Sequence, residues 1–467
     1  MQHNLLLKYK YLKFKYYNNK RDGISRTMKK LLILAYDFPP YVSVGGLRPY
    51  AWYRYLKEYG VEPVVVTRQW GNKYGSELDY IAPGESDETI VEETACGMVI
   101  RTPYNPNLAN RIMLKYGRTK FSLIRKMITA WYEFMQFLFF VGPKSGLYRG
   151  AKEYLKQNKV DAIIATGEPF VLFKYASALS SKYDIPWVAD YRDPWTENKN
   201  KVTSPFERFW ERRFMANATA MTTVSDFLKK KIGENITLPT TYIIPNGYNP
   251  DSIKQVEHIE QKNDVMRIAL AGSIYEWHPY KSVVSAFAEF VQKNNEIPKI
   301  ELNFFGINRH EEIRQYARKN KLENFIHVYP RMKNAELLEH LCEHNVMLLF
   351  NDYSYMGTKI YDYLAIKRQI ILCYSDDAET KKLKEDYYPY SLSEDKSLSN
   401  HLQEDCLLET NAGIIVKDKK HLSQVLTDLY AEFEANKSIR CNSDNTEKYS
   451  REEQTRQLAE IVLTELS

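Results

Sequence analysis

Short continuous apolar runs alternate with helical patterns along almost the whole chain, and this alternation limits the fold more than any other feature of the sequence. In the first half, the runs predict strands at 31–35, 63–67, 162–165, 187–190, 220–224 and 242–245, with a helix at 46–59 after the first strand. Such uninterrupted runs are typical of parallel strands that helices cover on both faces. The first half therefore predicts a doubly wound α/β domain.

A polar segment at 249–264 interrupts the pattern, which then begins again. Behind it we expect strands at 267–271, 300–305, 346–350, 369–373 and 413–416, and helices at 281–292, 311–320, 336–343 and 358–366. The chain is thus predicted to hold two Rossmann-like domains, at 29–248 and 265–446, joined by a linker at 249–264. Because ligands of such domains bind at the carboxyl ends of the strands, we expect the site in the cleft between them.

Residues 1–28 differ from the rest of the chain because they are basic and rich in Tyr and Asn. They carry seven basic residues and one acidic residue, which accounts for the whole formal net charge of +6. We interpret them either as a basic tail or as an over-extended reading frame whose true start is Met28. Since the remaining chain is neutral overall, no nucleic-acid partner is expected.

The cysteines and the hydropathy indicate the cellular compartment of the protein. The five cysteines are odd in number and scattered, with no Cys-x-x-Cys pair, which favours buried free thiols in a reducing environment and no metal site. No stretch of 18 apolar residues occurs. We therefore expect a cytoplasmic protein.

Two segments of the first half follow predicted strands and carry candidate ligand-binding residues. Gly45 and Gly46 stand where the first predicted helix begins. Glycine there lets the backbone approach a ligand closely, and the amides at the helix start can face a phosphate group. The alternative is a turn in which a glycine is the N-cap. Arg192 and Asp193 follow the strand at 187–190 and should point into the crevice. Asp193 is suited to position or deprotonate an acceptor hydroxyl, although an Arg–Asp pair that caps a helix would have the same sequence.

The first strand of the second half leads into Gly272 and Ser273, where the first loop of a Rossmann unit meets its ligand. Lys281 follows near the start of the next helix. A cation there would neutralise a departing diphosphate without a metal ion, and a solvated surface lysine is the alternative.

A later helix at 358–366 offers a second phosphate-binding pattern. Thr358 stands at its start, with Lys359 beside it and Asp362 one turn further on the same face. The alternative is an amphipathic helix with one surface ion pair between Lys359 and Asp362.

Taken together, these segments resemble the family 4 glycosyltransferases of GT-B fold. The resemblance runs from Lys29 to the C-terminus and rests on the order of six segments, which are Gly45-Gly46, 190–195, 223–226, 244–247, 359–365 and 449–459. It implies a GT-B fold of two Rossmann-like domains facing across a cleft, with a C-terminal helix at 447–467 that crosses back to the first domain.

The resemblance also implies a function. In the family, the second domain binds a nucleotide sugar, the first binds the acceptor, and the sugar is transferred with retention of configuration and without a metal ion or other cofactor. Carried over by position, Gly46 contacts the diphosphate, Asp362 binds the ribose hydroxyls, and Lys281 and Lys359 are the cations.

Three departures from the family pattern concern the site. The first of two acidic residues falls on Ser354, while Ser273 and Tyr275 crowd the place of an expected arginine. The segment Arg192-Asp193 stands where the family has a histidine in the first domain. The missing acidic residue and histidine leave open a non-catalytic glycosyltransferase-like scaffold subunit. A GT-B sugar-nucleotide epimerase is a separate alternative.

A basic stretch followed by an aromatic run indicates where the sugar acceptor could be located. Residues 94–132 hold seven basic and no acidic residues, and 128–141 is apolar and aromatic but too short to span a bilayer. This pattern favours interfacial contact with an anionic membrane surface, or a buried helix beside a solvated loop. Membrane contact would suit a polyprenyl-linked acceptor in cell-surface polysaccharide synthesis, at the inner face of the cell membrane.

Overall fold

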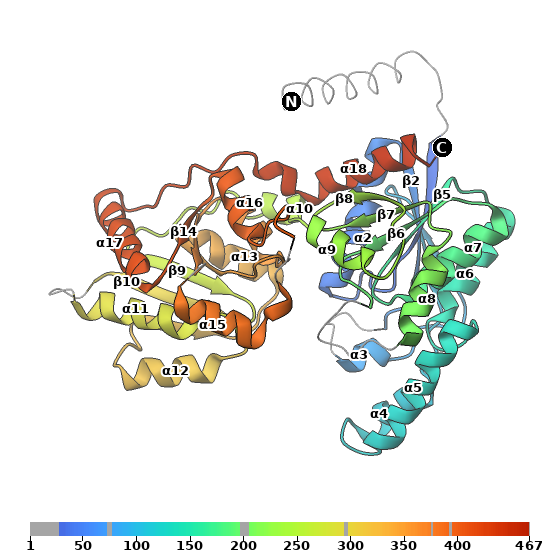
Figure 1. Cartoon of the computed structure of the whole chain (residues 1–467), viewed down its shortest axis with the longest axis horizontal. Helices are drawn as coiled ribbons and strands as arrows, with labels where there is room; N and C mark the ends of the chain where they lie inside the picture. The colour runs from blue at the N-terminus through green and yellow to red at the C-terminus, as the bar shows by residue number, and fades with distance from the viewer. Residues whose placement is uncertain are drawn as a thin grey trace, which may run out of the picture.

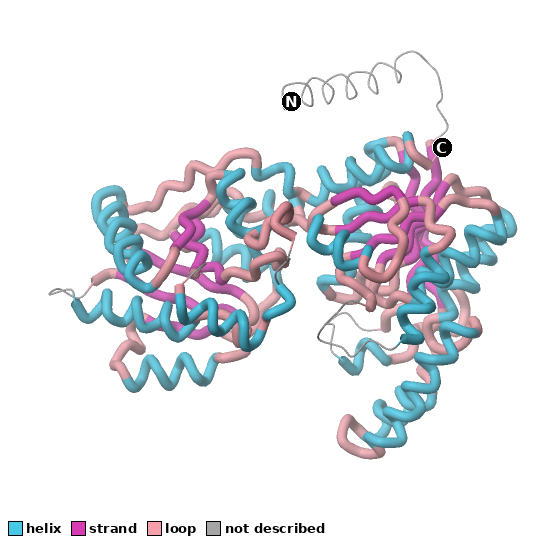
Figure 2. Tube along the Cα trace, viewed as in Figure 1, coloured by secondary structure: helices cyan, strands magenta, loops and turns pink. Residues whose placement is uncertain are grey.

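The computed structural model describes residues 28–71, 77–196, 205–293, 298–374, 377–391 and 395–466. Within them the chain forms two lobes, each built around one sheet with helices on both faces (Figures 1 and 2). The two α/β domains predicted from the sequence are thereby confirmed. Residues 1–27, most of the predicted basic tail, lie outside the described residues.

The first sheet has eight strands in the order β3-β4-β2-β1-β5-β6-β7-β8, and only the β3–β4 pair is antiparallel. The strands are β1 (Lys29–Leu34), β2 (Val61–Arg68), β3 (Ile90–Glu93), β4 (Met98–Thr102), β5 (Ala162–Thr166), β6 (Trp187–Tyr191), β7 (Ala220–Thr223) and β8 (Thr240–Ile243). The helices are α2 (Val44–Tyr55), η1 (Leu56–Tyr59), α3 (Glu77–Ile81), α4 (Leu108–Tyr116), α5 (Ser122–Leu138), α6 (Ser145–Gln157), α7 (Val171–Tyr183), α8 (Pro205–Met215) and α9 (Asp226–Gly233).

The second sheet has six strands, all parallel, in the order β11-β10-β9-β12-β13-β14. The strands are β9 (Met266–Ala271), β10 (Ile300–Phe305), β11 (Ile326–Tyr329), β12 (Val346–Phe350), β13 (Gln369–Cys373) and β14 (Gly413–Val416). The helices are α11 (Tyr280–Lys293), α12 (His310–Lys319), α13 (Asn334–Glu343), α14 (Lys359–Ile366), α15 (Ala378–Tyr387), η2 (Pro389–Ser391), α16 (Leu402–Thr410) and α17 (Lys419–Asn436). Among these described helices and those of the first domain, none combines the length and apolarity that crossing a membrane requires.

Alternate residues of β1 show why the runs are apolar throughout. Leu31 and Ile33 pack in one core with α2, while Leu32 and Leu34 pack on the opposite face against α6 and α7. Both faces of the strand are therefore removed from water, which leaves no position for a polar side chain.

The chain returns to the first domain through α18 (Arg451–Thr464), after η3 (Thr446–Tyr449), as Figure 1 shows. Leu458, Ile461 and Val462 of α18 are buried in the core that contains Leu31 and Ile33 of β1. The crossing helix predicted from the resemblance is confirmed.

Some elements differ from the sequence-based expectations. The helix expected at 46–59 is α2 followed by the 3-10 helix η1, and the segment 249–264 contains the short helix α10 (Pro250–Lys254). The apolar runs did not reveal β3, β4 and β11. In β3, which pairs with β4 alone at the sheet edge, the residues from Val91 to Glu93 are exposed, so no buried run marks it.

The crossing segment meets the end of the first domain at Gly247, where there is no room for a side chain. A Cβ on this residue would lie 2.2 Å from the backbone oxygen of Tyr449 and 2.4 Å from Nε2 of Gln454. Beside it, the amide of Tyr248 donates to the Tyr449 carbonyl at 3.1 Å, and that of Arg451 donates to the Tyr248 carbonyl at 2.9 Å.

We expect Gly247→Ala to separate these two segments. Because the nearest atom belongs to the backbone, the added methyl group forces a local shift that should cost about 1–3 kcal/mol of unfolding free energy. Urea unfolding monitored by circular dichroism measures the loss. Gly117→Ala is not a suitable control because its φ of 80° strains any side chain, whereas Gly71→Ala meets only one backbone oxygen at 3.1 Å and should cost less than Gly247→Ala.

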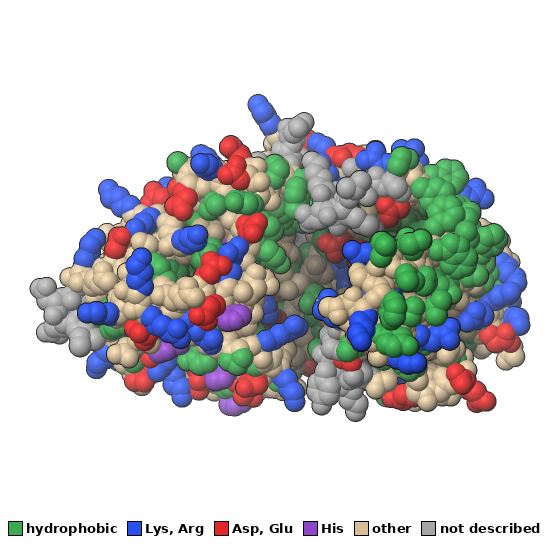
Figure 3. Space-filling view, turned by 90° about the horizontal axis from the view of Figure 1, so that it is seen from below, with side chains coloured by type: hydrophobic (Ala, Val, Ile, Leu, Met, Phe, Trp, Pro, Cys, Tyr) green, Lys and Arg blue, Asp and Glu red, His purple; other side chains and the backbone are tan. Residues whose placement is uncertain are grey.

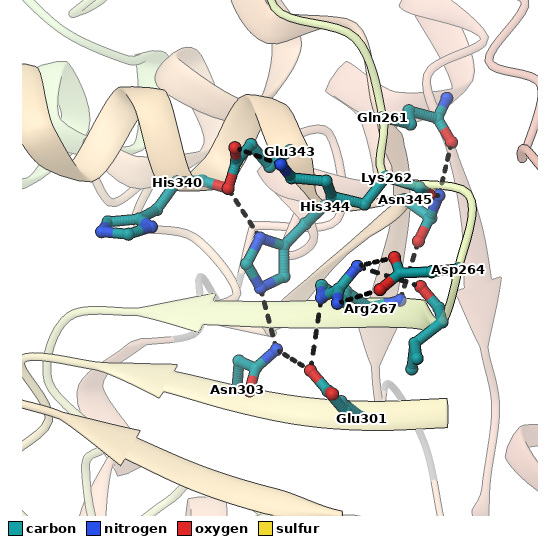
Figure 4. A network of polar contacts seen from close by, with 11 residues as sticks. Gln261, Lys262, Asp264, Arg267, Glu301, Asn303, His340, Glu343, His344 and Asn345 are labelled. Carbon is teal, nitrogen blue, oxygen red and sulfur yellow. Dashed lines mark hydrogen bonds and ion pairs between the residues drawn. The ribbon is translucent and has the colours of Figure 1, made fainter. Parts of the chain in front are cut away.

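A polar network at the amino ends of the second sheet's strands joins β9, β10 and α13 (Figure 4). Arg267 of β9 forms ion pairs with Asp264 at 2.6 Å and with Glu301 of β10 at 3.3 Å. His344 lies against it, with Nδ1 2.6 Å from the carbonyl oxygen of His340 and Nε2 3.0 Å from Nδ2 of Asn303. This geometry fits a neutral imidazole that donates from Nδ1 and accepts at Nε2.

Acid should weaken the fold through this histidine. Burial, together with the nearby Arg267 and His340, lowers the pKa of His344 to about 4, against 6.5 in the unfolded chain. Since the unfolded state binds more protons between these values, stability falls as the pH drops from 6.5 toward 4, by roughly 3 kcal/mol.

Urea unfolding at pH 7 and pH 4.5 measures this dependence. His344→Gln should flatten it, and His310→Gln, at an exposed position on α12, should not. An unchanged pH dependence in His344→Gln would show that other groups cause the acid sensitivity.

Candidate functional site

The carboxyl end of β1 leads into a loop that closes around Asp37. The Ser43 hydroxyl donates to Oδ2 of Asp37 at 2.6 Å and accepts from the amide of Gly46 at 3.1 Å, so Ser43 is the N-cap of α2. The Gly46 amide is therefore engaged within the protein. Gly46 is also buried, and a Cβ there would lie 3.3 Å from the backbone oxygen of Asp37.

Because Gly45 has no side chain, Asp37 and Arg192 can approach each other beside it. A Cβ on Gly45 would lie 2.8 Å from Oδ2 of Asp37 and 3.3 Å from Nη1 of Arg192. Burial raises the pKa of Asp37, against the lowering effects of the Ser43 hydrogen bond and the Arg192 charge. Oδ1 of Asp37 is buried without a hydrogen-bond partner among the described residues. The sequence analysis did not single out Asp37 as a site residue.

Asp190, near the end of β6, is a structural carboxylate, whereas Arg192 and Asp193 beyond the strand are the candidate site residues. Asp190 is fully buried and accepts from Arg48, from Thr166 at 2.8 Å and from Thr222 at 2.7 Å, so it joins β5, β6 and β7 to α2. The next polar residue, Arg192, donates through Nε to the carbonyl of Gly167 at 2.8 Å.

Asp193 lies near the second domain, since its charge acts on Tyr355 of the loop after β12. It is exposed, yet enough protein surrounds it that desolvation raises its pKa, while the Arg192 charge lowers it. No helix begins at Asp193 in the described segment 187–196, so it is not a helix cap there. Arg192 thus stands beside Asp37 at the carboxyl edge of the first sheet, and Asp193 follows it in the chain.

The carboxyl edge of the second sheet gathers four of the predicted residues. Gly272, with φ of 97°, follows β9, and a Cβ there would lie 3.4 Å from Cε of Lys359. Lys359 begins α14 directly after Thr358, and Asp362 lies one turn further. Burial raises the pKa of Asp362, whereas the charges of Lys359 and Arg451 lower it.

Arg451, the first residue of α18, brings a further charge to this edge. It is 7% exposed, its pKa is lowered to about 10 by burial, and its surroundings include Asp362, Arg48 and Arg192. Its Nε has no hydrogen-bond partner among the described residues. Arg451 therefore lies between the two edges, and its distance of 89 positions from Asp362 hid it from the sequence analysis.

The loop after β12 reaches the first domain. The ring of Tyr355 packs edge-on against Phe227 of α9, with the ring centroids 5.2 Å apart. Burial raises the pKa of Tyr355, and the nearby charge of Asp193 raises it further. Lys230 of α9 forms an ion pair with Asp395 at 3.3 Å. These contacts close one side of the cleft.

One predicted residue of the second domain, Lys281, lies apart from these four. Lys281 is exposed on the first turn of α11, with its ammonium 5.9 Å from the ring centroid of Tyr280, and no contact among the described residues joins it to Lys359. Ser273 follows Gly272 and is exposed.

Ser354, which stands where the family has its first acidic residue, has a structural role. Ser354 is fully buried and donates to Oδ1 of Asn400 at 2.9 Å. A carboxylate nearby, Asp352, instead lies 3.1 Å from Nε2 of His278 and 3.3 Å from Nε1 of Trp277. The sequence analysis missed this contact, because its partners are 74 and 75 residues apart along the chain.

Comparison with known proteins supports the family resemblance and the fold. Residues 132–252 match the family model described as Glycosyltransferase Family 4, which confirms the resemblance drawn from the sequence. No curated protein sequence matches the chain.

Solved structures match the whole architecture. Sucrose-phosphate synthase from Thermosynechococcus elongatus is similar with a TM-score of 0.50 and 13% identity, over 93% of this chain and 94% of that chain. An alpha,alpha-trehalose-phosphate synthase (UDP-forming) from Burkholderia vietnamiensis gives 0.51 and 11%, over 94% and 97%. The apo structure of OtsA gives 0.53 and 11%, over 93% and 99%. At these identities the likeness shows the fold, which is GT-B.

Proposed function

We propose that this GT-B chain, which carries a family 4 glycosyltransferase segment, transfers a sugar from a nucleotide sugar to a hydroxyl group of a glycan or lipid-linked glycan. The observation that carries the proposal is the pair of facing edges. Lys359, Asp362 and Arg451 meet on one side, and Asp37, Arg192 and Asp193 on the other. Buried atoms on both sides, Oδ1 of Asp37 and Nε of Arg451, lack partners among the described residues, as expected of groups that meet a ligand.

The second domain would hold the donor. Lys359 and the glycine backbone at Gly272 are suited to the diphosphate, since a cation in a partly desolvated cleft stabilises the charge that develops as the diphosphate departs. Thr358 and Ser273 offer hydroxyl groups beside it. Asp362 is purely an acceptor when it is ionised, which suits the ribose hydroxyls, and the neighbouring charges of Lys359 and Arg451 favour that form.

The first domain would hold the acceptor. In the reaction, the bond from the anomeric carbon to the diphosphate breaks and a bond to the acceptor oxygen forms on the same face. The acceptor proton leaves to the departing diphosphate or to Asp193, whose raised pKa makes its carboxylate a stronger base. Arg192 would orient the diphosphate from the opposite side of the cleft.

Retention of configuration and independence from a metal ion belong to the same proposal. Positive charge at the site comes from Lys359, Arg451 and Arg192, which could replace a divalent cation. Transfer should continue in excess EDTA, and proton NMR of the product should show the donor's anomeric configuration. Loss of activity in EDTA, restored by Mg²⁺ or Mn²⁺, would contradict this part of the proposal.

Nucleotide binding is the first test. A thermal-shift panel of UDP, GDP, CDP and dTDP on the full chain should reveal one stabilising nucleotide, worth roughly 2.7 kcal/mol at 100 times its dissociation constant. UDP comes first, because the similar Burkholderia enzyme is described as UDP-forming. Asp362→Asn should abolish the shift without changing the melting temperature of the free protein.

The two other functions predict different results. A scaffold subunit would show no shift with any nucleotide at millimolar concentration. An epimerase would consume its nucleotide sugar when no acceptor is present, whereas a transferase needs the acceptor.

The acceptor class needs a separate assay. We propose a polyprenyl-linked glycan, in keeping with cell-surface polysaccharide synthesis at the inner face of the cell membrane. Radiolabelled sugar should pass into an organic-extractable product when polyprenyl-diphosphate-linked acceptors are supplied. Equal transfer to soluble glycans, with no lipid-linked product, would contradict this acceptor.

A further inference from the structure

Helices α4 and α5 form a hairpin that projects from the first domain, at the lower right of Figure 1. None of the residues of α5 is buried, although most of the helix is apolar. A helix that packs against a domain normally buries one face. The exposed face of this hairpin is therefore available to something outside the chain.

One side of α5 carries a continuous apolar stripe. Leu123, Met127, Trp131, Phe134 and Leu138 follow one another at helical spacing and are 73%, 66%, 54%, 43% and 41% exposed. Phe134 stacks on Phe206 of α8 at 4.5 Å, which extends the surface toward the exposed Phe209. Figure 3 shows hydrophobic side chains gathered over this domain on the face seen from below.

The hairpin that carries the stripe is mostly basic. Residues 108–138 hold six basic residues and one acidic residue, Glu133, which is exposed on α5. Lys115, Lys120 and Lys126 are exposed near the turn between the two helices. A basic rim around an apolar helix face matches the headgroups and acyl chains of an anionic lipid surface.

The base of the hairpin is fixed to the domain. Lys174 of α7 donates to the carbonyls of Gln136 at 2.9 Å and Phe139 at 2.7 Å, which anchors the end of α5, and burial lowers its pKa to about 8. The ring of Phe137 lies 5.4 Å from that of Trp195, two residues beyond Asp193. The hairpin thus extends from the edge at which the acceptor is proposed to bind.

We infer that the α4–α5 hairpin docks onto an anionic phospholipid bilayer, with the stripe of α5 in the interface and the lysines of the turn at the headgroups. A second copy of this chain is a poorer occupant, because a symmetric contact would bring together two hairpins with six basic residues each. The inference does not rest on sugar transfer, and its test uses none.

Sedimentation with vesicles tests the docking. The full chain should co-sediment with vesicles of equal parts phosphatidylcholine and phosphatidylglycerol at physiological salt, and much less with phosphatidylcholine alone. Leu123→Ser/Met127→Ser/Trp131→Ser should weaken binding at least tenfold. Lys115→Glu/Lys120→Glu/Lys126→Glu should weaken it roughly a hundredfold and remove the preference for anionic lipid.

Matched substitutions and an association measurement complete the test. Val91→Ser/Leu408→Ser removes large side chains that are 55% and 71% exposed elsewhere on the surface, and should bind like the parent. Circular dichroism must show all variants folded. Equal sedimentation with and without vesicles would overturn the inference, as would a dimer in analytical ultracentrifugation that the stripe variant abolishes while vesicle binding persists.

Discussion

Replacing Lys359 by methionine should lower kcat for sugar transfer roughly 10²–10³-fold, the usual effect of removing one group that stabilises charge in a transition state. Lys359 begins α14 and packs its stem on Gly272, so its ammonium lies at the loop where the diphosphate is proposed to sit. Methionine keeps most of the stem and removes the charge. Because the charge on the diphosphate grows as the bond to the sugar breaks, the loss should appear in kcat more than in KM. Initial rates against donor concentration separate the two.

Lys281→Met provides the comparison. Lys281 is exposed on α11 and lies apart from Lys359, so its replacement should change kcat less than about threefold, as expected when no transition-state contact is lost. The melting temperatures of both variants should stay near that of the parent, since neither lysine is fully buried. The reverse pattern, with Lys281→Met inactive and Lys359→Met active, would assign the cation to Lys281.

The choice between these two lysines shows where the sequence stops being informative. Both follow a predicted strand and stand at a helix start, and sequence spacing cannot say toward which neighbour a long side chain turns. The contact between Lys359 and Gly272 comes from the packing of α14 beside β9. By contrast, Asp362 follows Lys359 by three residues on one helix, and local periodicity was enough to predict that the two charges influence each other.

The fold was more predictable than the site, for a physical reason. Apolar runs reveal strands that are buried on both faces, as in β1 and β9, while the exposed strand β3 left no such signal. The positions of Arg451 and Asp37 depend on the crossing of α18 and on the closure of a loop. Neither is a local property of the sequence.

The helix α5 illustrates the same limit for a surface. Its apolar spacing fits a buried helix as well as an interfacial one, and both interpretations were open from the sequence. The exposed fractions of Leu123 and Met127, 73% and 66%, exclude the buried helix.

Arg48→Ala should destabilise the fold by about 3–5 kcal/mol, because it leaves a buried carboxylate without its counter-ion. Arg48 is 3% exposed and Asp190 is fully buried, and their closest atoms, Nη2 and Oδ1, are 2.9 Å apart. The guanidinium also donates to the carbonyls of Ile244 and Pro245, at 2.9 and 3.0 Å. One side chain therefore ties α2, β6 and the segment before the linker together. Urea unfolding at pH 7 measures the loss.

A double variant distinguishes the cost of the unpaired charge from the loss of packing. Arg48→Met/Asp190→Leu removes both charges, so it should recover part of the stability that Arg48→Met alone loses. If the double variant is instead less stable than Arg48→Met, the hydrogen bonds that Asp190 receives from Thr166 and Thr222 outweigh the penalty of its unpaired charge. In either case the ion pair stabilises the first domain rather than binding a ligand. Any loss of nucleotide binding in Arg48→Ala should therefore track the loss of folded protein rather than a direct contact.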